Sequence, residues 1–158
     1  MEIRHLEERD YPGVIAVIDQ WWGGRHMADM LPKLFFVHFR DTSFAIEADG
    51  ELIAFLAGFV SQTDPRQAYI HFVGIHPAQR GRGRGRQLYA RFFDAARLRG
   101  CAAVRCVTSP VNAGSIAFHT RMGFQIEKAT GERGGVPCTI DYDGAGQDRV
   151  QFVKFLTT

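Results

Sequence analysis

The sequence of 158 residues has no long apolar segment. Its longest apolar run, residues 52–60, has the length of a strand and contains a glycine, whereas a membrane-spanning helix needs about 20 apolar residues. No repeat, low-complexity tract or linker interrupts the chain, so we expect a single domain over residues 1–158. The first residues lack the apolar core of a signal peptide, and we therefore expect a cytoplasmic protein with no membrane partner.

Cysteine and net charge are both scarce. The three cysteines, Cys101, Cys106 and Cys138, are odd in number and include no Cys-x-x-Cys pair. We therefore expect buried thiols in a reducing compartment, and no metal. The net charge is only +2, which is too small to indicate nucleic-acid binding by itself. We expect no nucleic-acid partner.

The spacing of apolar residues predicts about four helices. The first begins after Asp10, a candidate N-cap, and the second, rich in aromatic residues, covers about residues 27–39 and is interrupted by Pro32. A third follows a glycine-arginine run and ends at Gly100, and a fourth begins at Asn112. In the segments between these helices, apolar residues recur at the shorter spacing that is typical of strands.

Those segments predict about seven strands. Residues 43–48 and 51–60 flank Asp49-Gly50, a strong hairpin turn signal. Other strands are predicted at 68–75, 103–108, 124–127 and 150–156, with a polar segment at about 138–149. The order of elements indicates an α/β fold, an α+β sandwich in which helices flank a mixed central sheet.

The most informative segment is Gln79-Arg80-Gly81-Arg82-Gly83-Arg84-Gly85-Arg86, which follows a predicted strand and opens a predicted helix. At such a junction the chain presents unpaired backbone N–H groups to an anion, and glycines let the anion approach closely. Neighbouring arginines add charge-assisted hydrogen bonds. Together these features predict a cradle for a diphosphate.

Other motifs fit this segment less well. A P-loop requires a lysine after its glycines, and a dinucleotide fingerprint requires a third glycine where Leu88 stands. An RGG-type RNA-binding tract matches the composition, but such tracts are disordered and have no apolar helix behind them. A solvated basic turn is the remaining alternative.

Three motifs in order resemble those of the GNAT superfamily of N-acetyltransferases. Residues 80–85 match its R/Q-x-x-G-x-G/A coenzyme A signature, and residues 73–77 are similar to its strand ending in V-x-P. Residues 112–124 are similar to its N-x-x-A-x-x-x-Y-x-x-x-G-F segment. The resemblance implies a GNAT-like fold and an acetyl-CoA-dependent N-acetyltransferase. In that reaction an amine attacks acetyl-CoA directly in a ternary complex.

The resemblance also implies which residues bind the cofactor. Backbone N–H groups of the glycine-arginine turn would bind the pyrophosphate, and the preceding strand would pair with the pantetheine arm. The helix that begins at Asn112 would contact the cofactor too, although Asn112 could equally be a plain N-cap. The implied residues are Val73, Gly74, Ile75, Arg80, Gly81, Arg82, Gly83, Arg84, Gly85, Arg86, Asn112 and Ser115.

Two histidines are candidates for proton transfer. His119 stands where the family usually has a tyrosine that protonates the departing thiolate, and a histidine can donate a proton near neutral pH. His71 lies two residues before Val73, and strand alternation would place residues 71, 73 and 75 on one face, toward the thioester. We expect His71 to help remove a proton from the amine. For each, a purely structural histidine is the alternative.

The acceptor pocket is expected in the N-terminal half, and segments at residues 61–63, 108–110 and 141–143 could close its other side. Trp22, Arg25 and His26 follow the first helix, and Ser109 follows a strand. We expect the partner to be a small-molecule or peptide amine, and a homodimer is a further hypothesis. Two other functions stay open: a non-catalytic acyl-CoA-binding module, in which His119 marks lost chemistry, and an RNA-binding protein.

Overall fold

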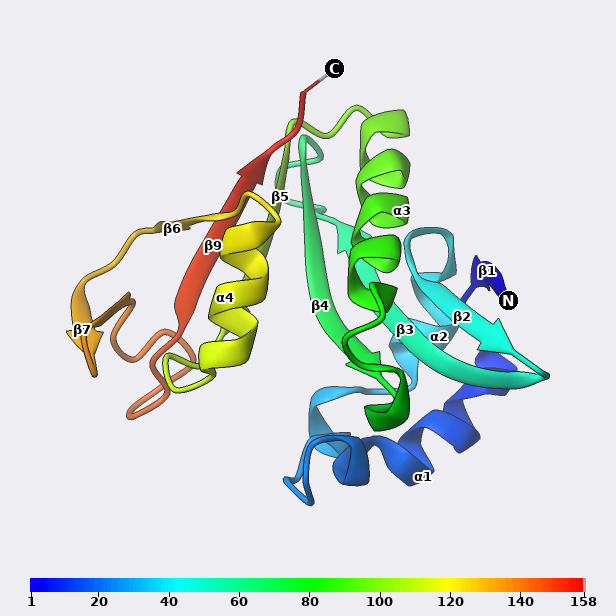
Figure 1. The fold of residues 1–158 in the computed structure, drawn as a ribbon. Helices are drawn as coiled ribbons and strands as arrows, with labels where there is room; N and C mark the ends of the chain where they lie inside the picture. Colours follow the sequence, from blue (N-terminus) through cyan, green and yellow to red (C-terminus); the bar gives the residue numbers. More distant parts are fainter. Residues whose placement is uncertain (158) are drawn as a thin grey trace.

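The computed structural model describes residues 1–157 (Figure 1). Within that range the main sheet has seven strands in the order β1-β2-β3-β4-β5-β9-β6. Only the β4–β5 pair is parallel, so the sheet is mixed, as predicted. The strands are β1 (Glu2–His5), β2 (Phe44–Ala48), β3 (Glu51–Val60), β4 (Gln67–Ile75), β5 (Ala103–Thr108), β6 (Gln125–Glu127) and β9 (Val150–Phe155).

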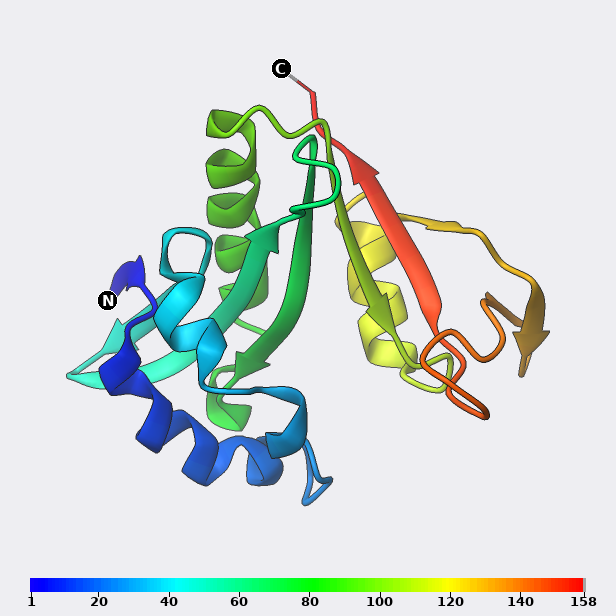
Figure 2. The same cartoon turned by 180° about the vertical axis from the view of Figure 1, so that it is seen from behind.

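Helices cover both faces of this sheet (Figures 1 and 2). The α-helices of the described chain are α1 (Tyr11–Trp21), α2 (Leu34–His38), α3 (Arg84–Leu98) and α4 (Ala113–Arg121). Helices α1 and α2 pack on one face, and α3 and α4 on the other. Single 3₁₀ turns stand at Glu8–Asp10, Ala28–Met30, Arg40–Thr42 and Pro77–Gln79. The predicted class and helix number are confirmed.

The predicted helical stretch over residues 27–39 is interrupted at Pro32, as expected, but its two parts are shorter than predicted. Leu31, directly before the proline, has φ −129° and ψ 71°, since a proline disfavours the helical conformation of the residue before it. The result is a single turn at Ala28–Met30 and the short α2. The break leaves the Met30 carbonyl oxygen available to the candidate site.

A small hairpin was not predicted. Strands β7 (Gly131–Arg133) and β8 (Val136–Cys138) form a separate two-stranded sheet within residues 1–157. Gly134 and Gly135 join them with φ of 56° and 80°. A two-residue Gly-Gly loop is a recognised hairpin signal, so the sequence did contain the information.

Each face of the sheet has its own apolar core. Leu88 and Phe92 of α3 are fully buried on one face, and Ile18 of α1 and Phe36 of α2 on the other. Burying one such side chain contributes about 1.5–3 kcal/mol. The sheet between these layers is therefore a rigid support for the candidate site.

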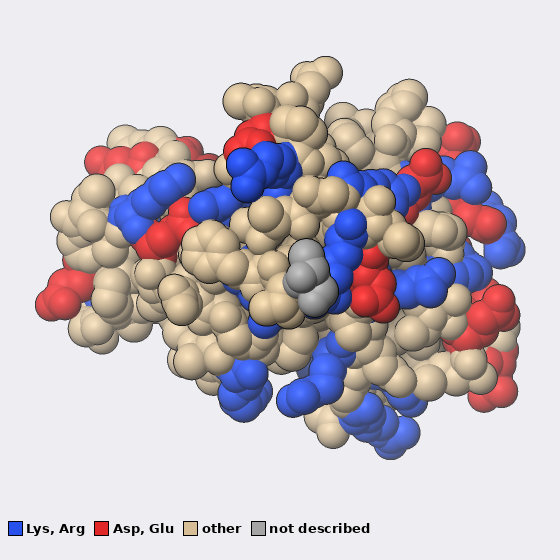
Figure 3. Space-filling model, turned by 90° about the horizontal axis from the view of Figure 1, so that it is seen from above, with Lys and Arg blue, Asp and Glu red and all other residues tan. Residues whose placement is uncertain are grey.

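Positive and negative side chains are mixed on the surface. On the face shown in Figure 3, Lys and Arg side chains are interspersed with Asp and Glu.

The three cysteines are free and buried, as predicted. No described helix has both the length and the apolar character needed to cross a membrane. Residues 1–157 contain no group of three or more His, Cys, Asp or Glu side chains that could hold a metal ion.

Candidate active site

The glycine-arginine turn leaves a row of backbone amides free at the start of α3. Gly81 and Gly83 have φ of 74° and 78°, in the left-handed region that glycine adopts readily. Gly83 is the N-cap of α3, and its carbonyl oxygen accepts a hydrogen bond of 3.0 Å from the Gln87 N–H. No acceptor in the described chain bonds the N–H groups of residues 81–86. Such an array at a helix start is a binding site for an anion.

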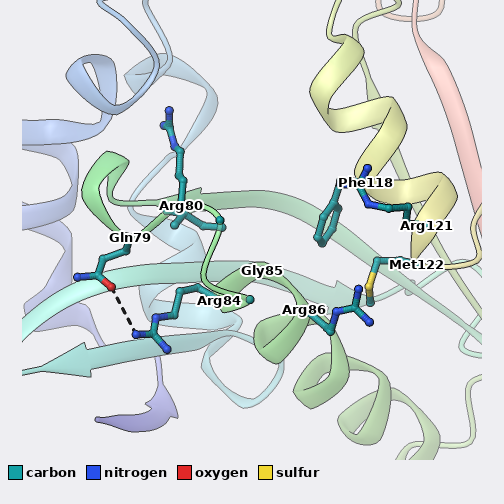
Figure 4. Close-up of a pocket in the computed structure, with 11 residues that line it drawn as sticks. Gln79, Arg80, Arg84, Gly85, Arg86, Phe118, Arg121 and Met122 are labelled. Carbon is teal, nitrogen blue, oxygen red and sulfur yellow. Dashed lines mark hydrogen bonds between the residues drawn. The ribbon is translucent and has the colours of Figure 1, made fainter.

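A cavity of about 310 Å³ lies over these amides (Figure 4). Gly85 forms part of its floor, because a Cβ there would lie only 3.2 Å from the Phe118 ring and 3.3 Å from Ile75 Cδ1. A side chain at this position would therefore press on Phe118 and Ile75, which pack closely on α3 here. The walls are completed by Gln79, Arg80, Gly81, Gly83, Arg84, Arg86, Arg121 and Met122.

The arginines of the turn do not all point into this cavity. The Arg80 guanidinium points away from it (Figure 4) and donates a hydrogen bond to the Trp21 carbonyl at the end of α1. Arg82 is exposed and lines neither cavity described here. The geometry therefore does not support cofactor contacts for these two side chains. Arg121 of α4 was not predicted, although it shares a helix face with Phe118 at i, i+3 spacing.

Strands β4 and β5 form a fork above the turn. Their parallel pairing ends at Tyr69 opposite Arg105, although β4 continues to Ile75 and β5 to Thr108. Figures 1 and 2 both show the two strands diverging beyond that point. The edge of β4 that faces β5 is therefore unpaired over most of its length.

The open edge of β4 offers free backbone groups. The His76 N–H bonds the Ile53 carbonyl of β3 at 2.8 Å. Because successive strand residues direct their backbone groups to opposite edges, those of Val73 and Ile75 point to the open side. Gly74 points its backbone at β3, and a Cβ on it would lie 2.4 Å from Phe55. Gly74 is thus required for packing and lines neither cavity.

A β-bulge interrupts β4 at His71. Ala57 of β3 pairs with Phe72, but the next residue, Gly58, pairs with Ile70. His71 is the extra residue of the bulge, and such an insertion reverses the alternation of the strand beyond it. Bulges often redirect a side chain in this way next to active sites.

The predicted common face for residues 71, 73 and 75 is therefore wrong. His71 stacks on Phe35 of α2 with ring centroids 4.2 Å apart, on the α1–α2 side of the sheet. Val73 and Ile75 pack on the opposite face, against the core beneath α3. His71 still lines a large cavity at the fork, together with Val73.

The His71 ring is fixed by one hydrogen bond. Its Nε2 lies 2.5 Å from the Met30 carbonyl oxygen, and a carbonyl only accepts, so Nε2 carries the hydrogen. Burial lowers the pKa of His71, although the bond to Met30 partly offsets that effect. At neutral pH the ring is uncharged, and Nδ1 is the nitrogen that can take up a proton.

His119 is buried between α3, α4 and β9. Its ring stacks on Phe152 with centroids 4.8 Å apart. Nδ1 lies 2.7 Å from the Ser115 carbonyl oxygen, and Nε2 lies 2.8 Å from the Tyr89 hydroxyl. Burial lowers the pKa of His119 and raises that of Tyr89. Tyr89 was not among the predicted site residues.

The N-cap prediction for Asn112 is confirmed. Its side-chain oxygen accepts a hydrogen bond of 3.1 Å from the Ser115 N–H, as expected at a helix start. Both residues also line the large cavity. The plain cap and the cofactor contact are therefore compatible.

The large cavity has a volume of about 840 Å³ and collects residues from distant parts of the chain. Its outer wall contains all four predicted pocket residues: Trp22, Arg25 and His26 after α1, and Ser109 after β5. Arg149 enters from the segment before β9 and forms an ion pair with Asp143 at 2.8 Å. Met30, Tyr69, Tyr89, Cys106 and Gln147 are further lining residues.

The free amides of residues 81–86, which form an amide cradle, the open edge of β4 and the large cavity lie one after another along β4. This arrangement has the geometry of a site for an extended ligand that carries a diphosphate and lies beside a strand. The chain matches the acetyltransferase (GNAT) family over residues 1–124. It belongs to that family.

Similar proteins agree with this assignment. The chain is 31% identical to an L-2,4-diaminobutyric acid acetyltransferase of Nocardia farcinica over 57% of its own length, but it spans only 49% of that relative. It is 29% identical to the enzyme of the same name from Virgibacillus pantothenticus, over 73% of this chain and 72% of the other.

A solved structure with its cofactor supports the fold. The Salmonella typhimurium protein yncA, solved with acetyl-CoA, superposes with a TM-score of 0.72 and 19% identity over 100% of this chain and 95% of that one. That likeness extends over β6 and β9 as well, beyond the part that the family match covers.

Proposed function

We propose that this protein is an acetyl-CoA-dependent N-acetyltransferase in which an amine attacks the thioester directly in a ternary complex. The observation that carries the proposal is the unpaired β4 edge, which joins the amide cradle to the large cavity. Family membership supports acetyl transfer, and the two relatives named above are both called acetyltransferases. Acetyl-CoA, when bound, supplies the activated acetyl group.

The residues at the turn fit a diphosphate. The free N–H groups of residues 81–86 would bind its oxygens, and the α3 dipole would favour the negative charge. Arg84, Arg86 and Arg121 would add charge from the cavity wall. The backbone groups of Val73 and Ile75 would pair with the amide-containing arm of the cofactor.

We assign His71 as the base that removes a proton from the amine. A protonated amine is not nucleophilic, so a base must remove a proton before or during attack. Because burial favours the uncharged form of His71 and Met30 holds its Nε2–H, the lone pair of Nδ1 is free to accept a proton. A backbone N–H near Val73 would polarise the carbonyl that is attacked.

For the acceptor we propose a small amine that also bears a carboxylate. The outer wall of the large cavity combines cationic Arg25 and Arg149 with anionic Asp143, which matches a molecule of mixed charge. The cavity volume of about 840 Å³ lies in the range of small-ligand sites, about 300–1,000 Å³. Diaminobutyric acid, in the names of two relatives, is such a molecule. A peptide amine is the alternative.

A panel assay tests both proposals. The protein is incubated with acetyl-CoA and L-2,4-diaminobutyrate, other diamino acids, the matching diamines without a carboxylate, and short peptides. Release of free thiol and the mass of the product are measured together. We expect diamino acids to be acetylated faster than diamines. Acetylation of peptides alone would contradict the proposed acceptor, and cofactor binding without product from any amine would support a non-catalytic module.

A further inference from the structure

Tyr89 of α3 places a buried phenol on the wall of the large cavity. Its side chain is only 3% exposed and lines that cavity. The ring lies edge-on to Phe93, Phe118 and Phe124, with centroids 5.0–6.1 Å apart. Since the surrounding rings hold the phenol in place, its hydroxyl has a fixed position, 2.8 Å from His119 Nε2.

The hydrogen bonds of His119 determine where the acidic hydrogen lies. Nδ1 is 2.7 Å from the Ser115 carbonyl oxygen, which can only accept, so Nδ1 carries the hydrogen. Nε2 of the neutral ring is then an acceptor, and Tyr89 donates to it. Burial lowers the pKa of His119, which favours this neutral form. The His119 N–H is thus held by a backbone carbonyl of its own helix, whereas the Tyr89 O–H is held only by the neutral imidazole and lies at the cavity.

We propose that Tyr89 is the general acid of acetyl transfer and that His119 positions its hydroxyl. The inference rests on the proposed function. The family resemblance puts a tyrosine at position 119, on α4. In this chain the imidazole of His119 occupies that position. The phenol is instead that of Tyr89 on α3, which contacts His119 across the α3–α4 interface.

Proton transfer from Tyr89 accompanies cleavage of the thioester. The amine nitrogen forms a bond to the carbonyl carbon, the C–S bond breaks, and its electron pair leaves on sulfur. The Tyr89 hydrogen turns from His119 Nε2 to the sulfur, which as an anion is the stronger acceptor. The O–H bond breaks and an S–H bond forms. Solvent water returns a proton to the Tyr89 oxygen, and the acylated nitrogen gives up its own, so no net proton is consumed.

Tyr89→Phe removes only the hydroxyl oxygen and tests the proposal. We expect kcat to fall by about 10²-fold, as for the loss of a general acid, while calorimetry gives wild-type affinity for coenzyme A. In the ligand-free protein, ¹⁵N NMR should show a changed His119 Nε2 resonance, because that nitrogen loses its donor. Tyr11→Phe is the matched control, since Tyr11 lies on α1, away from both cavities. It should leave all three measurements unchanged.

Moving the phenol to the family position sharpens the test. The double variant Tyr89→Phe/His119→Tyr supplies the hydroxyl from α4 and should recover much of the lost kcat. Fluorinated tyrosines at position 89 change the acidity of the phenol and hardly its size, and single-turnover rates should follow that acidity. Wild-type kcat in Tyr89→Phe, or rates that ignore fluorination, would overturn the proposal. If the wild-type protein acetylates no amine, it is the proposed function that fails.

Discussion

The two ends of the open β4 edge are built in different ways. At the cofactor end the backbone amides come from one continuous stretch, in which β4 leads through residues 77–83 into α3, and α4 adds side chains to the cavity wall. The acceptor end brings together side chains far apart in sequence: His71 bonds Met30, and Arg149 lines the same cavity as Trp22. A site made by the backbone of one turn tolerates little change, whereas a wall of separate side chains can be altered residue by residue. We therefore expect the cofactor end to be similar among relatives and the acceptor end to determine which amine is acetylated.

The largest expected effect is at the cofactor end. Gly83→Asp should abolish binding of coenzyme A in calorimetry, because the new carboxylate would occupy the anion site and repel the diphosphate. Nothing lies within 4 Å of a Cβ at Gly83, so the fold should survive with a loss of about 1–2 kcal/mol from the left-handed backbone. Gly85→Asp is unsuitable, since its Cβ would meet Phe118.

A matched control for Gly83 lies just beyond the other end of the same helix. Gly100 has φ 79° and equally open space around a Cβ. Gly100→Asp should show a similar loss of stability but bind coenzyme A with wild-type affinity. Weakened binding in both variants would mean that backbone strain, and not the anion site, explains the effect.

The next effect is on the chemistry at the bulge. His71→Gln should lower kcat by about 10²-fold with little change in the affinity for coenzyme A. The base must be uncharged to act, so wild-type activity should fall as the pH drops through the lowered pKa of His71. In the variant this acid-side inflection should disappear. The exposed His38 provides a control, and a His71→Gln profile identical to wild type would show that His71 is structural.

A smaller effect is expected at the acceptor wall. Trp22 packs on Phe72 with centroids 5.0 Å apart and faces the large cavity. Trp22→Ala should raise the KM for the acceptor by up to about tenfold, since one aromatic contact contributes about 0.5–1.5 kcal/mol. The affinity for coenzyme A should not change. Equal losses for both substrates would argue against a division between the two ends.

The smallest effect concerns stability and pH. Burial lowers the pKa of both His71 and His119 below the unfolded value. Below an unfolded pKa of about 6.5 the unfolded chain binds more protons than the folded one. The contribution of these two histidines to the free energy of unfolding should therefore be fully present above that pH. The free energy of unfolding should decrease as the pH falls below it. Urea titrations at several pH values should show a weaker decrease in His119→Phe.

The same contrast explains what the sequence could predict. The glycines of residues 81–85 act through their own backbone, and the signal is local, so the cradle and its place before α3 were predicted. The bulge at His71 depends on how β3 and β4 pair, and no residue of β4 alone reveals it. The Tyr89–His119 contact joins α3 and α4 through two residues that are 30 positions apart in the sequence, and helical spacing marks Tyr89 only as a core residue.

Binding of acetyl-CoA is the measurement that tests the central claim most directly. A ligand at about a hundredfold excess over its Kd stabilises the folded state by about 2.7 kcal/mol. For a chain of this size we expect the Tm to rise by about 5–10 °C with acetyl-CoA, and not to rise in Gly83→Asp. An unchanged Tm of the wild-type protein at millimolar acetyl-CoA would contradict the account.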